Sequence, residues 1–116
     1  MEIKVLTSEN YLIVELKGEF DHHNAGEFKD LVEKELKKGI YDCLLLELSG
    51  LKFMDSSGVG AVIGRYKSIS NTGGKVIACG LTPQVETIFE ISGLKKIISI
   101  YPSLEEAINN RRERKN

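Results

Sequence analysis

Five short runs of apolar residues predict β-strands. They are EIKVLT, YLIVEL, CLLLEL, KVIAC and KIISIY, at residues 2–7, 11–16, 43–48, 75–79 and 96–101. The first run alternates, with Ile3 and Val5 on one face, and the second is expected to end at Gly18. The third is almost wholly apolar, which is typical of a central strand covered on both faces.

Apolar residues at helical spacing predict a helix in each remaining segment. The stripes are Phe28, Leu31, Val32 and Leu36; then Val59, Val62, Ile63, Tyr66 and Ile69; then Val85, Ile88 and Phe89; and last Leu104, Ala107 and Ile108. The first helix is expected over Ala25–Lys38, with Gly39 as its stop. NTGG ends the second helix, and the third runs from the Thr82-Pro83 pair to Gly93.

The predicted order is β-β-α-β-α-β-α-β-α, which is an α/β fold. Right-handed crossovers make the last four strands parallel and pack the helices on a mixed, mostly parallel sheet. The loops at Gly18–Asn24, Leu51–Ser57 and Gly80–Pro83 then leave the sheet at its carboxyl edge. Sites in open α/β sheets are usually built at that edge, so GEFDHHN and MDSSG are expected to share one surface.

Length and composition fit one globular domain. The 116 residues suit a single core, and 41% hydrophobic with 28% charged residues is ordinary for a soluble protein. We expect one domain over residues 1–110 and a polar tail over 111–116. The end of the chain, NNRRERKN, is read as a solvated helix end that frays, with a patch for nucleic acid or an acidic partner as the alternative.

Charge and hydropathy argue against several classes of partner. A formal net charge of −1 disfavours broad contact with nucleic acid. No apolar run approaches the roughly 20 residues of a membrane helix, and the N-terminus lacks the apolar run of a signal peptide. Cys43 and Cys79 lie in apolar runs, so buried free thiols in a reducing cytoplasm are expected.

The stretch FMDSSGVGAVIGRYK, residues 53–67, carries the most candidate chemistry. A nucleophile elbow needs glycine two residues before and two after its serine, and neither Ser56 nor Ser57 meets that pattern. The only histidines are His22 and His23, and the sequence places no acid to orient either of them. Serine hydrolysis is therefore disfavoured.

The glycines in this stretch resemble a dinucleotide-binding fingerprint. GVGAVIG lies between a strand and a helix, but the next strand ends in VIACG without the acidic residue that the fingerprint requires. Gly60 and Gly64, with Ala61, are instead expected to let the helix approach the sheet.

The triplet DHH, residues 21–23, contains metal-ligand residue types. No further cluster of such residues accompanies it in the sequence, so neither a metal nor a cofactor is expected. The triplet is interpreted as a polar loop in which Asp21 or Asn24 caps the first helix.

A serine at the start of a helix can also be the group that is modified. Ser56 and Ser57 stand where free N–H groups and the positive end of the helix dipole suit a hydroxyl cap and also suit a phosphate. Phosphorylation adds about −1.5 to −2 charges, here beside Asp55. A partner packed against the neutral serine would lose affinity, while the fold would survive.

Three segments in order resemble the bacterial anti-sigma factor antagonists, which are built on the STAS domain. The segments are GEFDHHNA, FMDSSGVGAVIGRYK and ISGLKKII, at residues 18–25, 53–67 and 91–98. The likeness runs from about Ile3 to Ile108 and is greatest to the sporulation members that antagonise the anti-sigma F factor. Phe20 stands where a leucine is usual in those members.

The resemblance implies a STAS fold of the predicted order and a regulator that is not an enzyme. Its unphosphorylated form is expected to bind an anti-sigma factor that is a serine kinase, which frees the sigma factor. The kinase is expected to phosphorylate Ser56 and so abolish binding, and a separate serine phosphatase resets the protein.

Partner contacts are expected at Asp21 and Asp55, with Ser57 and Gly58 shaping the helix entrance. Arg65 is either a further recognition residue or a solvated helix residue. Two other functions remain open at this point: a general-stress antagonist, and a STAS module that senses a nucleotide or another ligand.

Overall fold

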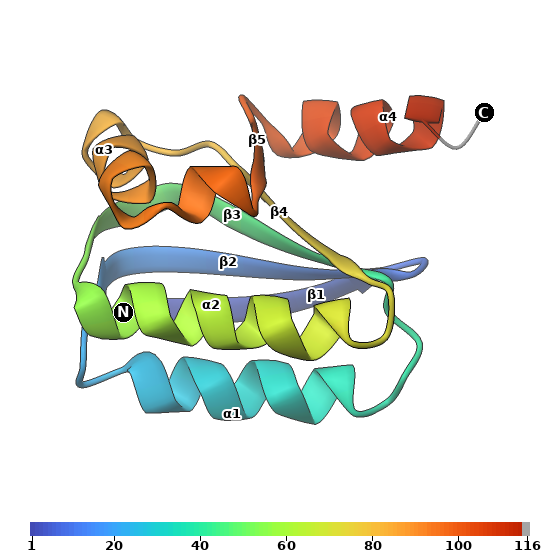
Figure 1. Cartoon of the computed structure of the whole chain (residues 1–116), viewed down its shortest axis with the longest axis horizontal. Coiled ribbons are helices and arrows are strands. Elements are labelled where there is room, and N and C mark those ends of the chain that lie inside the picture. Colours follow the sequence, from blue (N-terminus) through green and yellow to red (C-terminus); the bar gives the residue numbers. More distant parts are fainter. Residues whose placement is uncertain (115–116) are drawn as a thin grey trace.

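The computed structural model describes residues 1–114, with side chains through residue 110 (Figure 1). The elements are β1 (Glu2–Ser8), β2 (Tyr11–Phe20), α1 (Ala25–Leu36), β3 (Cys43–Met54), α2 (Ser56–Ser70), β4 (Lys75–Cys79), α3 (Pro83–Ser92), the 3-10 helix η1 (Leu94–Lys96), β5 (Ser99–Tyr101) and α4 (Leu104–Arg114). Apart from η1, this is the predicted order.

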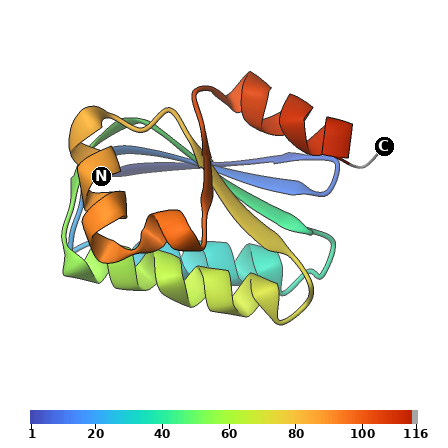
Figure 2. The same cartoon turned by 45° about the horizontal axis from the view of Figure 1, so that its top comes forward.

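The strands form one mixed sheet in the order β1-β2-β3-β4-β5. β1 pairs antiparallel with β2 through the tight turn at residues 9–10, and the other neighbours are parallel, as predicted. α1, α2 and α3 cover one face of the sheet, and α4 lies on the other face (Figures 1 and 2). The crossovers place the N-termini of α1 and α2 at the carboxyl edge of the parallel strands.

The core has two parts, because alternate residues of the central strands point to opposite faces. Leu12, Val14 and Leu16 of β2 pack under α1, α2 and α3. Tyr11 and Ile13 face α4, whose Ala107 is fully buried against them. The predicted covering of CLLLEL on both faces is confirmed, since its residues are divided between the two parts.

The two strands that lead to the carboxyl edge are longer than predicted. Gly18 does not end β2; it adopts a φ of +106° within an irregular stretch, and pairing with β3 continues to Phe20 and Met54. Such bulges let two strands stay paired after their regular register is lost. The loops that follow therefore shrink to residues 21–24 after β2 and to Asp55 alone after β3.

Other boundaries differ by smaller amounts. α1 ends at Leu36, two residues before the predicted end, and Leu31 is 37% exposed and so lies at the margin of the predicted stripe. β5 has three residues rather than six, because Leu94–Lys96 close into η1. The start of α3 is confirmed, with the Thr82 hydroxyl accepting from the backbone N–H of Val85.

The C-terminal helix α4 extends through Arg114. The side chains of the polar tail predicted at 111–116 lie outside the described residues. Within residues 1–114, every helix is too short or too polar to cross a membrane.

Candidate functional site

Ser56 is the first residue of α2, and its side chain is exposed. The residue before it, Asp55, is the N-cap: its Oδ1 accepts hydrogen bonds from the backbone N–H groups of Ser57, at 2.8 Å, and Gly58, at 3.1 Å. The expectation that a serine caps this helix is therefore wrong. Because aspartate already satisfies the free N–H groups, the hydroxyl of Ser56 has no part in the cap.

The first turn of α2 packs tightly against the end of β2. The backbone N–H of Asp55 donates to the carbonyl oxygen of Phe20 at 3.0 Å. A Cβ at Gly58 would lie 2.7 Å from that same oxygen, so only glycine fits there without movement. The predicted role of Gly60 and Gly64 in close helix packing is wrong, because a Cβ at either position would meet open space.

This packing argues against a phosphate cradle at the glycine-rich stretch. The close approach that Gly58 permits is taken up by the chain's own backbone at Phe20. Two of the N–H groups that could bind a nucleotide phosphate, those of Ser57 and Gly58, are taken up by Asp55. A phosphate on Ser56 would likewise find the N–H groups of Ser57 and Gly58 occupied, so these two donors are not free to hold it.

The loop after β2 is organised by its own side chains. The Asn24 side chain accepts from the N–H of Asp21 at 3.0 Å and donates to the carbonyl of Glu19 at 2.8 Å. Asp21 Oδ1 accepts from the N–H of His23 at 3.0 Å. Asn24 occupies the N-cap position of α1, but neither its side chain nor that of Asp21 caps the helix. The expectation that one of the two would cap it is therefore wrong.

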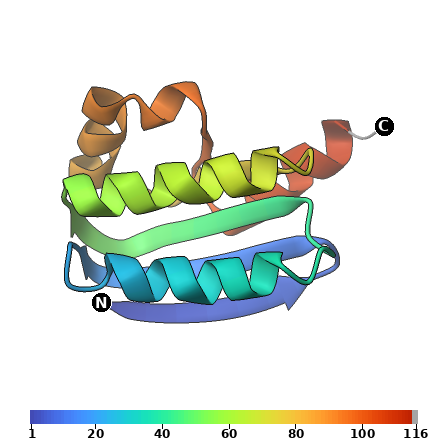
Figure 3. The same ribbon diagram turned by 60° about the horizontal axis from the view of Figure 1, so that its bottom comes forward.

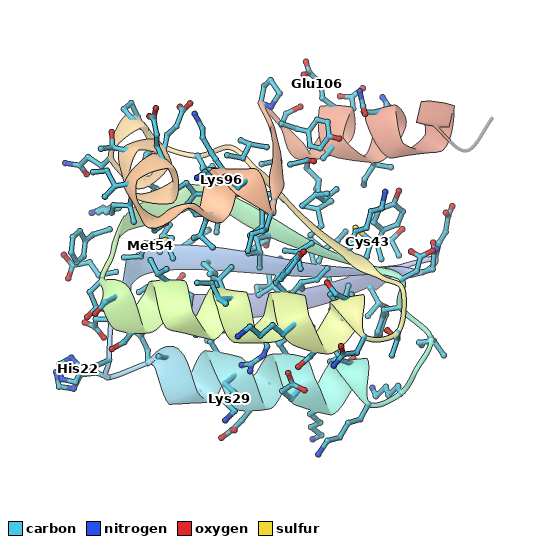
Figure 4. The ribbon with its side chains drawn as sticks, viewed as in Figure 1. His22, Lys29, Cys43, Met54, Lys96 and Glu106 are labelled. Atoms are coloured by element: carbon cyan, nitrogen blue, oxygen red, sulfur yellow. The ribbon has the colours of Figure 1, made fainter. Side chains whose placement is uncertain are left out.

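The histidines of this loop point outward. The rings of His22 and His23 stack with centroids 4.0 Å apart, and Figure 4 shows His22 projecting away from the domain. Among the described residues, no three His, Cys, Asp or Glu side chains gather as a metal site would require.

The two motifs share one surface, as predicted. Phe20 pairs with Met54 at the end of the sheet, so the loop that begins at Asp21 lies beside Asp55 and Ser56. We call this surface, formed by Glu19, Asp21, Asp55 and Ser56, the acidic edge. Figure 4 places His22 and Met54 at this end of the molecule and Cys43 at the other end. None of the ion pairs between described residues involves its carboxylates.

Arg65 does not contribute to the acidic edge. Its side chain is buried between α2 and α1, with the residue 6% exposed, and its Nε lies 2.7 Å from Oε1 of Glu33. Both expectations for Arg65, a contact with a partner and a solvated side chain, need exposure and are wrong. The sequence held a usable signal, because Arg65 falls on the stripe formed by Val62 and Ile69.

The STAS domain model matches residues 2–107 of the chain. The chain belongs to the STAS domain family. Nearly the whole of the described structure is thus accounted for by this one domain, in agreement with the resemblance noted in the sequence.

Two relatives of this STAS domain illustrate what its family members do. It is 35% identical to a protein of Paenibacillus polymyxa named anti-sigma F factor antagonist, covering 93% of this chain and 92% of that protein. It is 32% identical to a protein of Listeria monocytogenes named anti-sigma-B factor antagonist, covering 86% of each.

A solved structure shares the same architecture. The Bacillus cell fate determinant SpoIIAA in its phosphorylated form matches with a TM-score of 0.75 and 27% identity, covering 94% of this STAS domain and 98% of SpoIIAA. The fold predicted from the sequence is therefore confirmed in the order of its strands and helices along the chain, in the direction of its strands and in its family.

Proposed function

We propose that this STAS domain is a phosphorylation-controlled partner switch. Its unphosphorylated form binds an anti-sigma factor that is also a serine kinase, and this binding releases a sigma factor for transcription. Phosphorylation of Ser56 abolishes the binding, and a serine phosphatase restores it. The names of the relatives support the antagonist role, and the phosphorylated state of SpoIIAA supports the covalent control.

The observation that carries the proposal is the division of roles between Asp55 and Ser56. Asp55 caps α2, so the exposed hydroxyl of Ser56 is available to a kinase without loss of a helix contact. The names of the relatives support a role as a regulator and not as an enzyme.

Electrostatics explain why the phosphate would act on the partner more than on the fold. The acidic edge already carries Glu19, Asp21 and Asp55, which suit a partner with matching cations. A phosphate on Ser56 adds about −1.5 to −2 charges to this edge, at the exposed first residue of α2 and outside the core. A partner whose cations are already paired would have to bury this charge uncompensated, which costs several kcal/mol.

Variants of Ser56 test the proposal. Ser56→Ala is expected to bind the anti-sigma kinase as the native chain does, but ATP should no longer release it. Ser56→Asp should keep the fold and bind at least about tenfold more weakly, which is ~1.4 kcal/mol. Calorimetric titration against the kinase, with and without ATP, measures both effects. Release of the Ser56→Ala variant by ATP would refute Ser56 as the acceptor.

The choice of partner lies between two classes of anti-sigma factor. Sporulation is favoured, because the relative with higher identity antagonises an anti-sigma F factor, and a general-stress role is the alternative. Titrating the same preparation against one kinase of each class decides between them. We expect the tighter complex with the F class, in the cytoplasm where sigma factors act.

A further inference from the structure

Two charged side chains meet between α1 and α2: Arg65 is buried, and Glu33 is partly buried, with its side chain 27% exposed. Glu33 of α1 and Arg65 of α2 approach to 2.7 Å between Oε1 and Nε. The same Glu33 oxygen accepts a hydrogen bond from the hydroxyl of Ser68 at 2.7 Å. One carboxylate oxygen thus holds two side chains of the neighbouring helix. We call these three residues the helix clamp.

The helix clamp is placed where it can fix the position of the Asp21 loop, which precedes α1, relative to Ser56, which begins α2. α1 and α2 lie side by side and run in the same direction (Figures 1 and 3). The Asp21 loop leads directly into α1, and Ser56 begins α2. Glu33 and Arg65 stand eight and nine residues after their helix starts, which is about 12 and 14 Å along the axes. The helix starts are therefore nearly level.

Apolar packing between the helices is less able to fix the position of α1 along α2. Phe28 and Val32 of α1 and Val62 and Ile69 of α2 contribute to the shared core, and such contacts are not directional. An ion pair of this kind is a poor source of net stability, but in some proteins such a pair selects one register over others. Arg65 meets Glu33 through charge and proximity, since its buried Nε and Nη1 have no well-directed hydrogen bond within the described residues.

We infer that the helix clamp is a positioning device for partner recognition: it sets α1 against α2 so that the Asp21 loop and Ser56 face one partner together. This inference rests on the proposed function for the partner, but the helix register itself can be measured in the free protein. In this proposal Glu33, Arg65 and Ser68 act through the placement of the two helix starts and not through contact with the partner.

The test replaces the ion pair by apolar residues of similar size, in the double variant Glu33→Met/Arg65→Leu. Removing both charges leaves no buried charge unpaired, so the free energy of unfolding is expected to be kept or raised. Spin labels on Glu27→Cys and Gly60→Cys, both exposed near the helix starts, report the distance between them. The native Cys43 and Cys79 are buried and stay unlabelled.

In the double variant, we expect the distance distribution to shift or broaden and the affinity for the anti-sigma kinase to fall about tenfold. Lys38→Met is the matched control. Lys38 follows the end of α1, and its exposed side chain pairs with Glu35 of α1 at 2.8 Å. Removing this pair, which does not link α1 to α2, should change neither quantity. If the double variant does not fold, Arg65→Lys takes its place, with a smaller shift and a smaller loss of affinity.

An unchanged distance distribution in the folded variant would overturn the clamp. A changed distribution with native affinity would overturn its role in recognition. If the native chain itself binds neither class of anti-sigma kinase, the proposed function fails, and the distance measurement still decides whether the clamp sets the register.

Discussion

Two glycines of α2 are expected to respond to alanine in opposite ways. Gly58→Ala would bring a Cβ to 2.7 Å from the Phe20 carbonyl, and the backbone movement this forces should cost about 1–3 kcal/mol of stability. Gly60→Ala meets open space in a helical position and should stabilise by roughly 0.5–1 kcal/mol. Urea denaturation followed by circular dichroism measures both.

Gly60→Ala serves as the control for Gly58→Ala, since both add one methyl group to the same turn of the helix. Equal effects of the two substitutions would contradict the close approach between α2 and β2. Gly58→Ala should also weaken partner binding, because the movement displaces Ser56 relative to Asp21.

At the scale of elements, α4 is the cover of the smaller core. Ala107 is fully buried, and Cys43 and Cys79 lie in the same apolar cluster. Burial, with a smaller effect of the nearby Glu47 carboxylate, raises the pKa of the Cys79 thiol to about 12. This thiol is therefore protonated and unreactive near neutral pH while α4 is in place.

Ala107→Asp is expected to displace α4 from the sheet. A carboxylate in this apolar contact has no partner, and burying it is more costly than releasing the helix. Labelling of Cys43 and Cys79 by a thiol reagent at pH 8 should then become much faster than in the native chain. Asn109→Asp places the same group on an exposed position of α4 and should leave the rate unchanged.

At the scale of the whole molecule, phosphorylation changes the charge far more than the shape. The formal net charge at pH 7 is −1, and a phosphate would bring it to roughly −2.5 to −3. The modified protein should focus at a pH below the pI of 6.1 calculated for the unmodified sequence, with an unchanged hydrodynamic radius. Isoelectric focusing and gel filtration of kinase-treated protein check the two expectations, and Ser56→Ala should show no shift.

The order of strands and helices followed from periodicity, because each element buries one face and so repeats its apolar residues at a fixed spacing. The ends of β2 and β3 could not be predicted from periodicity, because the pairing beyond Gly18 depends on the partner strand and not on local sequence. Glu33 was missed as the partner of Arg65, because the two are far apart in the chain and only the crossover brings them together.

The sequence predicted that the residues of the acidic edge lie close together, but it did not predict the hydrogen bonds that they make. Parallel strands bring their carboxyl ends to one edge, and this placed Asp21 near Ser56. Which residue caps α2 was misjudged, because aspartate and serine have similar preferences for the N-cap and stand next to each other here.

The separation of the cap from the proposed phosphate acceptor has a consequence for how this position evolves. Since Asp55 secures the helix, the codon for Ser56 can change without a penalty in folding. If the proposed switch operates, an alanine codon would give a lineage a regulator that is permanently active, and an aspartate codon one that is permanently silent. Asp55 has no such freedom, because its loss would remove the cap of α2 and change the proposed recognition surface at once.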